Sequence, residues 1–226
     1  LLEQRLIYGY YPEVVTHDVN RAERTLYDLS DGLMYKDLLT LDQVKKPSLL
    51  VKLLQALALQ LGSEVSYHEV AQLIGADPAT VERYIDLLEQ TFVLFRLPSL
   101  NRNARNEIKK GRKIYFYDNG IRNAVIKNFN PPALRQDTGA LWENFLVTER
   151  MKRNVYRNYN CNTFFWRTTN QQEIDYVEEY GGKLYAFEFK WRPDAAARFP
   201  KSFLEAYPGS ETALINRENF DAFLLG

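Results

Sequence analysis

The chain has 226 residues, of which 46% are apolar, 14% aromatic and 26% charged. This composition excludes an intrinsically disordered protein, because disordered chains carry too few apolar and aromatic side chains to form a core. The 29 basic residues balance the 29 acidic ones, so contact with nucleic acid or a membrane must come from a local patch and not from an overall charge.

Cysteine content and hydropathy indicate a cytoplasmic protein that does not enter a membrane. Cys161 is the only cysteine, which excludes an intrachain disulfide and a metal site built from cysteines alone. The most apolar run, residues 49–61, is too short to span a bilayer, and the N-terminus lacks the pattern of a signal peptide. Because the first residue is Leu1 and not Met, we expect the chain to be part of a longer protein.

Residues 1–61 are predicted to be mostly helical. Apolar side chains recur at helical spacing between residues 21 and 39. Pro47 opens a second helix that runs to residue 61 and stops before Gly62, because proline favours the first turn of a helix and glycine its end.

Residues 62–118 carry the signals of a winged helix-turn-helix. Two short helices are predicted from their capping residues and from a glycine between them, in chain order Ser66, Glu69, Gly75, Asp77 and Pro78. Such a pair of capped helices joined by a tight turn is typical of a helix-turn-helix. Two strand-like runs, 92–97 and 113–117, flank a polar loop and supply the wing.

From residue 119 to 226 the pattern predicts one α/β domain. A helix over 138–155 precedes three strands, a helix over 199–207 precedes a fourth, and the strands are 163–167, 173–178, 183–190 and 212–216. A short helix over 219–225 ends the chain. The fold class is therefore α+β, with a helical N-terminal segment and a winged helix before an α-β-β-β-α-β domain that has a mixed sheet.

Acidic and basic side chains follow the second and third strands of this domain. The glycines at 181–182 predict a two-residue hairpin turn, whose register places Asp175 opposite Glu188 and Glu173 opposite Lys190 on one face. Like charges about 5 Å apart destabilise a sheet unless a positive group lies between them. Mg²⁺ or Mn²⁺ suits carboxylate oxygens, and Lys190 could stabilise charge on a phosphate. The pattern indicates metal-assisted hydrolysis of a phosphodiester.

The same residues also fit a solvated sheet face without chemistry. In that alternative, Glu173 and Lys190 form a cross-strand ion pair. A β-bulge in either strand would break the register on which the metal site depends. Residue pattern alone leaves both interpretations open.

Short motifs in a fixed order point to a known family. In chain order they are YGYYPEVV at 8–15, YKDL at 35–38, TVERYIDLLE at 80–89, KIYFYDNG at 113–120, GALWENF at 139–145, WRT at 166–168, EIDYV at 173–177 and FEFK at 187–190. Their succession resembles the C-terminal region of prokaryotic AAA-type ATPases. In these proteins a domain of unknown function has a restriction-endonuclease-like fold of the PD-(D/E)xK superfamily.

The resemblance implies roles for four residues. Asp175 matches the aspartate of strand two, Glu188 and Lys190 match the E-x-K of strand three, and Glu143 matches the acid of the first helix. These four are the expected catalytic residues, and the three carboxylates are the expected Mg²⁺ or Mn²⁺ ligands. Nuclease activity does not follow, because such folds often persist as binding modules.

The resemblance also divides the chain. It implies a helical remnant of the ATPase over 1–61, the winged helix over 62–118 and the nuclease-like domain over 119–226, with the ATPase core missing upstream. No G-x-x-x-x-G-K-[ST] motif occurs, so we expect no ATP site in this chain.

The expected nucleic-acid contact is double-stranded DNA, bound through the basic wing. Six basic residues gather in and beside the loop, namely Arg102, Arg105, Lys109, Lys110, Arg112 and Lys113. They could follow a phosphate backbone without reading sequence. The second helix of the pair is less suited to phosphates, since it carries three acids against one arginine. The alternative is a protein-docking module whose basic loop is only solvated.

Three functions therefore remain open from the sequence. The first is a regulatory and DNA-binding region of an AAA-type ATPase with a latent metal-dependent nuclease site. The second is an active Mg²⁺-dependent deoxyribonuclease, and the third is a protein-interaction module without nucleic-acid binding. The oligomeric state, the nucleic acid and the pathway do not follow from the sequence.

Overall fold

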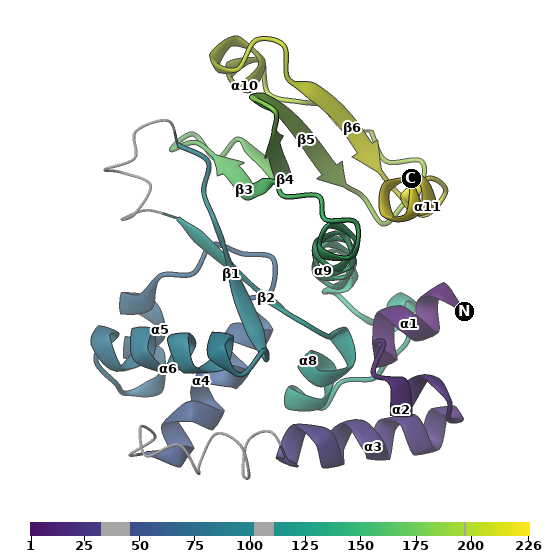
Figure 1. The fold of residues 1–226 in the computed structure, drawn as a ribbon. Helices are drawn as coiled ribbons and strands as arrows, with labels where there is room; N and C mark the ends of the chain where they lie inside the picture. The colour runs from purple at the N-terminus through teal and green to yellow at the C-terminus, as the bar shows by residue number, and fades with distance from the viewer. Residues whose placement is uncertain (33–45, 102–110, 197) are drawn as a thin grey trace. The chain divides into compact units, whose positions relative to one another are not determined.

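The structure is a computed structural model that describes residues 1–32, 46–101, 111–196 and 198–226 (Figure 1). It is a mixed α and β protein with a four-stranded sheet and a separate two-stranded sheet. Its contacts divide the chain into two compact units. Unit 1 comprises residues 1–96 and 114–137, and unit 2 comprises residues 97–113 and 138–226.

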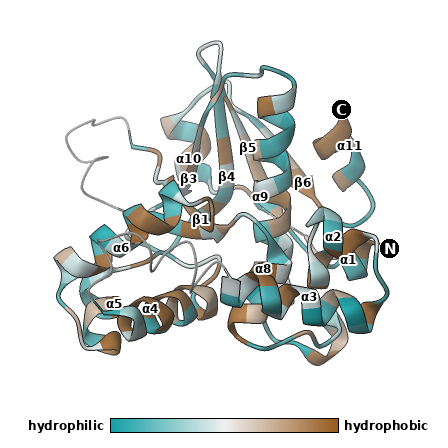
Figure 2. Cartoon of the chain, turned by 60° about the horizontal axis from the view of Figure 1, so that its bottom comes forward, coloured by the Kyte–Doolittle hydropathy of each residue, from teal (hydrophilic) through white to brown (hydrophobic). Residues whose placement is uncertain are grey.

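Unit 1 is built mainly from helices. They are α1 (Leu2–Tyr8), α2 (Pro12–Val15), α3 (Val19–Gly32), α4 (Pro47–Leu59), α5 (Tyr67–Ile74), α6 (Pro78–Gln90), α8 (Asn119–Val125) and the 3-10 helix η2 (Pro132–Leu134). Figure 2 colours α4 as hydrophobic along much of its length, and its leucines at 50, 53, 54 and 57 are buried. No helix among the described residues is both long and apolar enough to cross a bilayer.

The capping residues predicted for α5 and α6 are confirmed. The Ser66 hydroxyl accepts a hydrogen bond from the Glu69 N–H, and the Asp77 carboxylate accepts one from the Thr80 N–H at 2.8 Å. Gly75 ends α5 in the left-handed conformation, with φ of 74°. Each contact satisfies a backbone group that a helix end leaves unpaired, so these short helices begin and end where their sequence indicates.

The predicted pair of strands after α6 is also present. β1 (Leu94–Pro98) and β2 (Arg112–Phe116) form the two-stranded sheet. The Ser99 N–H donates to the Gly111 carbonyl and the Tyr117 N–H donates to the Val93 carbonyl, so the strands run antiparallel. The division between the two units passes through this ribbon.

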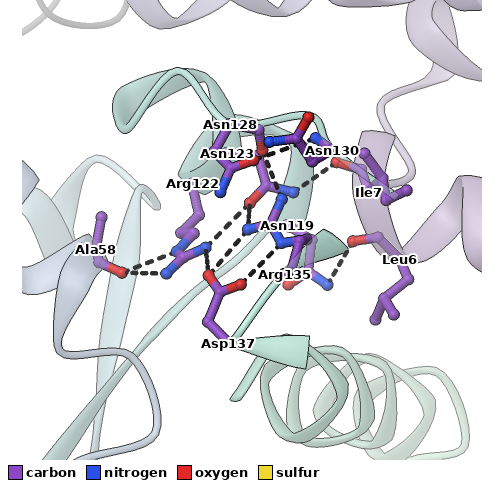
Figure 3. A network of polar contacts seen from close by, with 10 residues as sticks. All are labelled: Leu6, Ile7, Ala58, Asn119, Arg122, Asn123, Asn128, Asn130, Arg135 and Asp137. Atoms are coloured by element: carbon purple, nitrogen blue, oxygen red, sulfur yellow. Dashed lines mark hydrogen bonds and ion pairs between the residues drawn. The ribbon is translucent and has the colours of Figure 1, made fainter. Parts of the chain in front are cut away.

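Residues 119–137 pack in unit 1, which differs from the predicted boundary at 119. The reason is a polar network around α8 (Figure 3). The Arg122 guanidinium donates to the Ala58 carbonyl at the end of α4, at 2.8 and 2.6 Å. The side-chain amides of Asn119 and Asn123 donate to the Leu6 and Ile7 carbonyls at the end of α1. The α8 side chains thus satisfy carbonyls that two other helices leave unpaired.

Asp137 closes this network. Its carboxylate lies 2.5 Å from Arg122 and 2.8 Å from Arg135, whose guanidinium also bonds the Asn123 side chain. Burial alone would raise the pKa of Asp137, but its hydrogen bonds and the charges of both arginines lower it to about 2. The pKa of Arg122 is also lowered, because burial of this guanidinium outweighs the attraction of Asp137. Arg122 stays charged at neutral pH, so the pH dependence of the pair lies in the carboxylate.

Unit 2 has the predicted element order α-β-β-β-α-β. Its elements are α9 (Thr138–Tyr156), β3 (Asn162–Arg167), β4 (Glu173–Tyr180), β5 (Lys183–Phe189), α10 (Lys201–Ala206), β6 (Glu211–Ile215) and α11 (Phe220–Leu225). The strands lie in the order β3-β4-β5-β6. The first three are antiparallel and β6 runs parallel to β5, which confirms the mixed sheet.

The register between β4 and β5 agrees with the prediction over most of its length. Paired residues run from Tyr180 and Lys183 at the turn to Tyr176 and Phe187. The ladder ends there, so the predicted direct pairing of Asp175 with Glu188 does not form.

A β-bulge in β4 gives the reason. On the β3 side, Phe164 pairs with Val177, whereas Trp166 pairs with Ile174. Two residues of β4, 175 and 176, therefore lie opposite Phe165 alone, and the strand is kinked at this point. The predicted pairing of Glu173 with Lys190 does not form either, because the ladder to β5 ends at Tyr176, and Glu173 pairs only with Arg167 on the β3 side.

Apolar side chains pack on the sheet of unit 2 from α10 and α11. Phe203 of α10 packs edge-on against Trp166 within a cluster that includes Ile174. Phe223 of α11 packs against Phe187 and Phe189 of β5. Together these contacts fix the strands that carry the predicted site residues.

Candidate functional site

Unit 2 brings together the four residues predicted for the nuclease-like site. Glu143 comes from α9, Asp175 from the bulge in β4 and Glu188 from β5, and Lys190 follows the end of β5. Burial raises the pKa of Asp175 well above its usual value, and the negative charges of Glu143 and Glu188 raise it further. Both glutamates are therefore near enough to Asp175 to repel its carboxylate.

Asp175 is held at the centre of this group by the main chain of β5. Its Oδ2 atom accepts a hydrogen bond of 2.7 Å from the Phe189 N–H. The bulge turns Asp175 out of the regular ladder and makes this contact geometrically accessible. A bulged residue that binds a neighbouring strand through its side chain is well fixed, which is a property that a functional carboxylate needs.

Lys190 and Glu188 form an ion pair at the end of β5. Their Nζ and Oε1 atoms are 2.7 Å apart. Burial would lower the pKa of Lys190, but the carboxylates of Glu188, Asp175 and Glu143 outweigh burial and raise it. Lys190 is therefore a cation next to the carboxylates, as the E-x-K pattern predicts.

Lys113 is the residue whose role the sequence did not reveal. It was expected to join the basic loop and contact nucleic acid, yet its ammonium is buried, with 1% of the side chain exposed. It lies 2.9 Å from Glu143 Oε1 and 2.5 Å from Glu173 Oε1. That part of the prediction is wrong, because a buried ammonium paired with two carboxylates cannot reach a phosphate.

The carboxylates keep Lys113 charged in spite of its burial. Burial favours the neutral amine and would lower the pKa of Lys113, but Glu143, Asp175 and Glu173 together raise it above its ordinary value. The sequence contained one signal of this role. Lys113 falls within the predicted strand 113–117 and not within the loop, so a position in the interior was available to it.

Glu173 completes the cluster but does not pair as the alternative interpretation predicted. Its carboxylate binds Lys113 and lies 4.0 Å from the guanidinium of Arg167. Lys190, its predicted partner, binds Glu188 instead. The solvated sheet face is therefore replaced by a partly buried ion-pair cluster.

The arrangement does not fit a divalent metal ion as it stands. Over the described ranges, no three His, Cys, Asp or Glu side chains are placed to hold one. Carboxylate oxygens are suitable donors for Mg²⁺ or Mn²⁺. Here, however, Glu143 binds Lys113, Asp175 binds a backbone N–H and Glu188 binds Lys190. Each carboxylate already has a positive or hydrogen-bonding partner within the protein.

The predicted DNA contacts lie largely outside the described residues. Those outside are Arg102, Arg105, Lys109 and Lys110. Arg112 is described and is half-buried in β2. The loop therefore remains a prediction from its sequence.

The acidic helix of unit 1 is more nearly neutral than its sequence indicates. Arg96 of β1 binds Glu89 of α6 through its Nε atom at 2.8 Å and reaches Asp86 through Nη2 at 2.6 Å. Its backbone N–H donates to the same Glu89 carboxylate. One arginine thus pairs with two of the three acids of α6 and offsets one of their negative charges.

Comparison with family models places the chain in a family. Residues 1–132 match the model of a domain of unknown function, DUF8612. The chain belongs to this family. Residues 138–223 match a second domain of unknown function, DUF4143. The two matches are separated by residues 133–137. These are the last residues of unit 1, and α9 of unit 2 begins directly after them.

Curated relatives of this family member are uncharacterized proteins. Those of Mycobacterium tuberculosis and Mycobacterium bovis are each 29% identical over 131 residues, which is 57% of this chain and 29% of the relative. One of Haemophilus influenzae is 25% identical over 124 residues, which is 53% of this chain and 31% of the relative. The chain thus spans less than a third of the length of these relatives. No solved structure matches it.

Proposed function

We propose that this chain is the C-terminal regulatory and DNA-binding region of an AAA-type ATPase and that unit 2 carries a latent nuclease-like site. One observation carries the proposal. Glu143, Asp175 and Glu188 converge beside Lys190 within an α-β-β-β-α-β unit. These residue types, on these elements, are the set that the resemblance to PD-(D/E)xK proteins implies.

The contacts of the cluster favour binding over cleavage. A metal-dependent phosphodiesterase needs carboxylate oxygens that are free to coordinate the ion. Glu143 and Glu188 are each engaged by a lysine ammonium, and Asp175 by a backbone N–H. We therefore assign no reaction step to a metal at this site.

The distribution of charge supports contact with DNA. Five basic residues of the loop and its edge remain after Lys113 is removed from the set, and they are Arg102, Arg105, Lys109, Lys110 and Arg112. Arg96 pairs with Asp86 and Glu89 and offsets one of the negative charges that α6 presents to phosphates. Phosphate contacts of this kind position a duplex without reading its sequence.

The length of the relatives supports the assignment to a larger protein. This chain matches less than a third of each curated relative. An ATP-binding core would therefore have room in the remainder of such a protein. We expect this core to hydrolyse ATP and the present chain to regulate that hydrolysis by binding DNA.

Binding of a short DNA duplex, measured by fluorescence anisotropy between 20 and 200 mM salt, tests the proposal. We expect weak binding whose logarithm falls linearly with the logarithm of salt concentration. Replacing Lys109 and Lys110 by alanine should reduce that slope by up to about two, since each lost phosphate contact removes about 0.9. A variant with alanine at Lys52 and Lys201, both exposed, removes the same charge and should bind as the wild type does. Absence of binding at 20 mM salt would exclude the proposal.

A Mg²⁺-dependent deoxyribonuclease is the second candidate, and the proximity of Glu143 and Glu188 to Asp175 favours it. That function predicts cleavage of DNA in Mg²⁺ or Mn²⁺ that Asp175→Ala abolishes. Cleavage that survives in Asp175→Ala would come from another site or a contaminant. A pure protein-interaction module predicts neither binding nor cleavage.

A further inference from the structure

We propose that Lys113 is a resident cation that takes the place of a divalent metal ion in the acidic cluster of unit 2. The inference rests on the nuclease-like site proposed above and states why that site is latent. Four carboxylates meet in the cluster, those of Glu143, Glu173, Asp175 and Glu188. Lys113 is the most deeply buried of the cations that accompany them.

The position of Lys113 distinguishes it from an ordinary surface ion pair. With 1% of its side chain exposed, its ammonium has lost its hydration and depends on Glu143 and Glu173 for hydrogen bonds. A buried charge without partners is strongly destabilising, so the carboxylates and the lysine require one another. The sequence pattern called for a positive group between the carboxylates, and the lysine supplies it.

The backbone holds this ammonium in place. Lys113 lies in β2, directly after Arg112 and two residues after Gly111. The Gly111 carbonyl accepts a hydrogen bond of 3.1 Å from the Ser99 N–H. On its other side the ammonium faces the ring of Phe165, at 5.5 Å from the ring centre, which is the residue opposite the β4 bulge. Strand β2 therefore positions the Lys113 ammonium beside the bulge of β4 that contains Asp175.

The charge balance of the cluster explains why a divalent metal ion is disfavoured there. Among the described residues, four carboxyl groups face the cations Lys113, Lys190 and Arg167, so the cluster carries at most one net negative charge, and the raised pKa of Asp175 reduces that charge further. A divalent ion would make the cluster positive and would lie near an ammonium whose side chain is 1% exposed. Two like charges in a poorly solvated site repel strongly. Without the positive charge of Lys113, the carboxylates would repel one another and would favour the binding of a metal ion.

Titration of the full chain with Mn²⁺ by calorimetry tests this inference. We expect the wild type to show no saturable binding below about millimolar Mn²⁺. Lys113→Met, which removes the charge and keeps a similar apolar stem, should bind Mn²⁺ at least tenfold more tightly. Adding Asp175→Asn to this variant should abolish the gain. Thermal unfolding gives a second readout, because Mn²⁺ should raise the midpoint of Lys113→Met and leave that of the wild type unchanged.

Lys190→Met is the matched control. It removes one positive charge from the same cluster but leaves the buried ammonium in place. Its gain in Mn²⁺ affinity should be much smaller than that of Lys113→Met. Equal gains would mean that any charge in the region acts alike, and the specific role of Lys113 would be wrong. Asp175-dependent Mn²⁺ binding by the wild type, as tight as that of Lys113→Met, would also overturn it.

A second variant covers the case in which Lys113→Met does not fold. Lys113→Met combined with Glu173→Gln removes one charge of each sign and leaves Glu143, Asp175 and Glu188 intact. This variant should fold and bind Mn²⁺, whereas Glu173→Gln alone should not bind. A folded double variant without Mn²⁺ binding would reject the inference.

The outcomes separate this inference from the proposed function. DNA binding measured by anisotropy does not depend on Mn²⁺ in the proposal above. DNA binding without the gain in Lys113→Met would reject the resident cation alone. A gain in Mn²⁺ affinity of Lys113→Met without DNA binding would reject the proposed function and support the inference on Lys113.

Discussion

Arg150 and Glu178 form a two-pronged ion pair inside unit 2. The Arg150 Nε and Nη2 atoms donate to the two Glu178 oxygens at 2.9 and 2.7 Å, and Glu178 is fully buried. Asn154 donates to the same carboxylate at 2.6 Å. This geometry satisfies a charge that the interior would otherwise exclude, and it joins α9 to β4.

Glu178→Gln should lower the free energy of unfolding by about 3 kcal/mol, since removing one partner leaves the other charge buried. Urea unfolding followed by circular dichroism measures this change. Glu211→Gln is the control, because its pair with Lys183 is exposed to solvent and should contribute little to stability. Equal effects of the two substitutions would show that the Arg150–Glu178 pair does not stabilise the fold.

Asp137→Asn should destabilise the protein in a pH-dependent way. Because the pKa of Asp137 is lowered to about 2 in the folded state, its contribution is present above the ordinary value near 4 and is lost as pH falls towards 2. We expect a loss of about 2 kcal/mol at pH 7 that shrinks progressively below pH 4. Urea unfolding at pH 7, 5 and 3 measures it. Asp28→Asn, at an exposed position on α3, should show no such trend.

Gly9→Ala should destabilise unit 1 strongly. Gly9 has φ of 71°, and an added Cβ would lie 2.1 Å from an Asp118 carboxylate oxygen. That carboxylate caps α8 and accepts the Tyr10 N–H, so it cannot move aside without losing these bonds. We expect a loss of about 2 kcal/mol or more from strain and displaced contacts. Thermal unfolding measures this loss. Gly32→Ala, where a Cβ meets no atom of the described residues within 4 Å, should be neutral in the same experiment.

Cys161 should react slowly with alkylating reagents. Burial raises the pKa of its thiol to about 11, and the negative charge of Glu178 adds to the effect. The reactive thiolate is then about a hundredfold scarcer at pH 8 than for an unperturbed cysteine. The rate of iodoacetamide modification, compared with that of glutathione at the same pH, measures this. A rate equal to that of glutathione would mean that the thiol is not perturbed.

Local sequence signals predicted the elements well. Ser66, Gly75 and Asp77 fix helix ends through contacts within a few residues, so their effect can be read from the chain itself. The turn at 181–182 set the register of β4 and β5 for the same reason. The order of elements in unit 2 followed from these local features.

Long-range contacts account for what the sequence did not predict. The bulge at Asp175 arises between β4 and β3, two strands that a longer turn over residues 168–172 joins and no glycine pair marks in the sequence. Lys113 meets Glu143 across 30 positions of sequence, and nothing near it in the chain indicates a carboxylate partner. The place of α8 depends on carbonyls of α1 and α4, which are more than 50 residues away.

The discontinuity of unit 1 has a consequence for synthesis. When residue 96 leaves the ribosome, α1 and α4 are complete, but the side chains of α8 that bind their terminal carbonyls do not yet exist. The contacts of α8 with α1 and α4 can form only after residues 97–113, which belong to the other unit, and residues 114–137 have also emerged. The nascent chain thus carries an incomplete first unit, with the terminal carbonyls of α1 and α4 unpaired by α8, while the first residues of the second unit are already made.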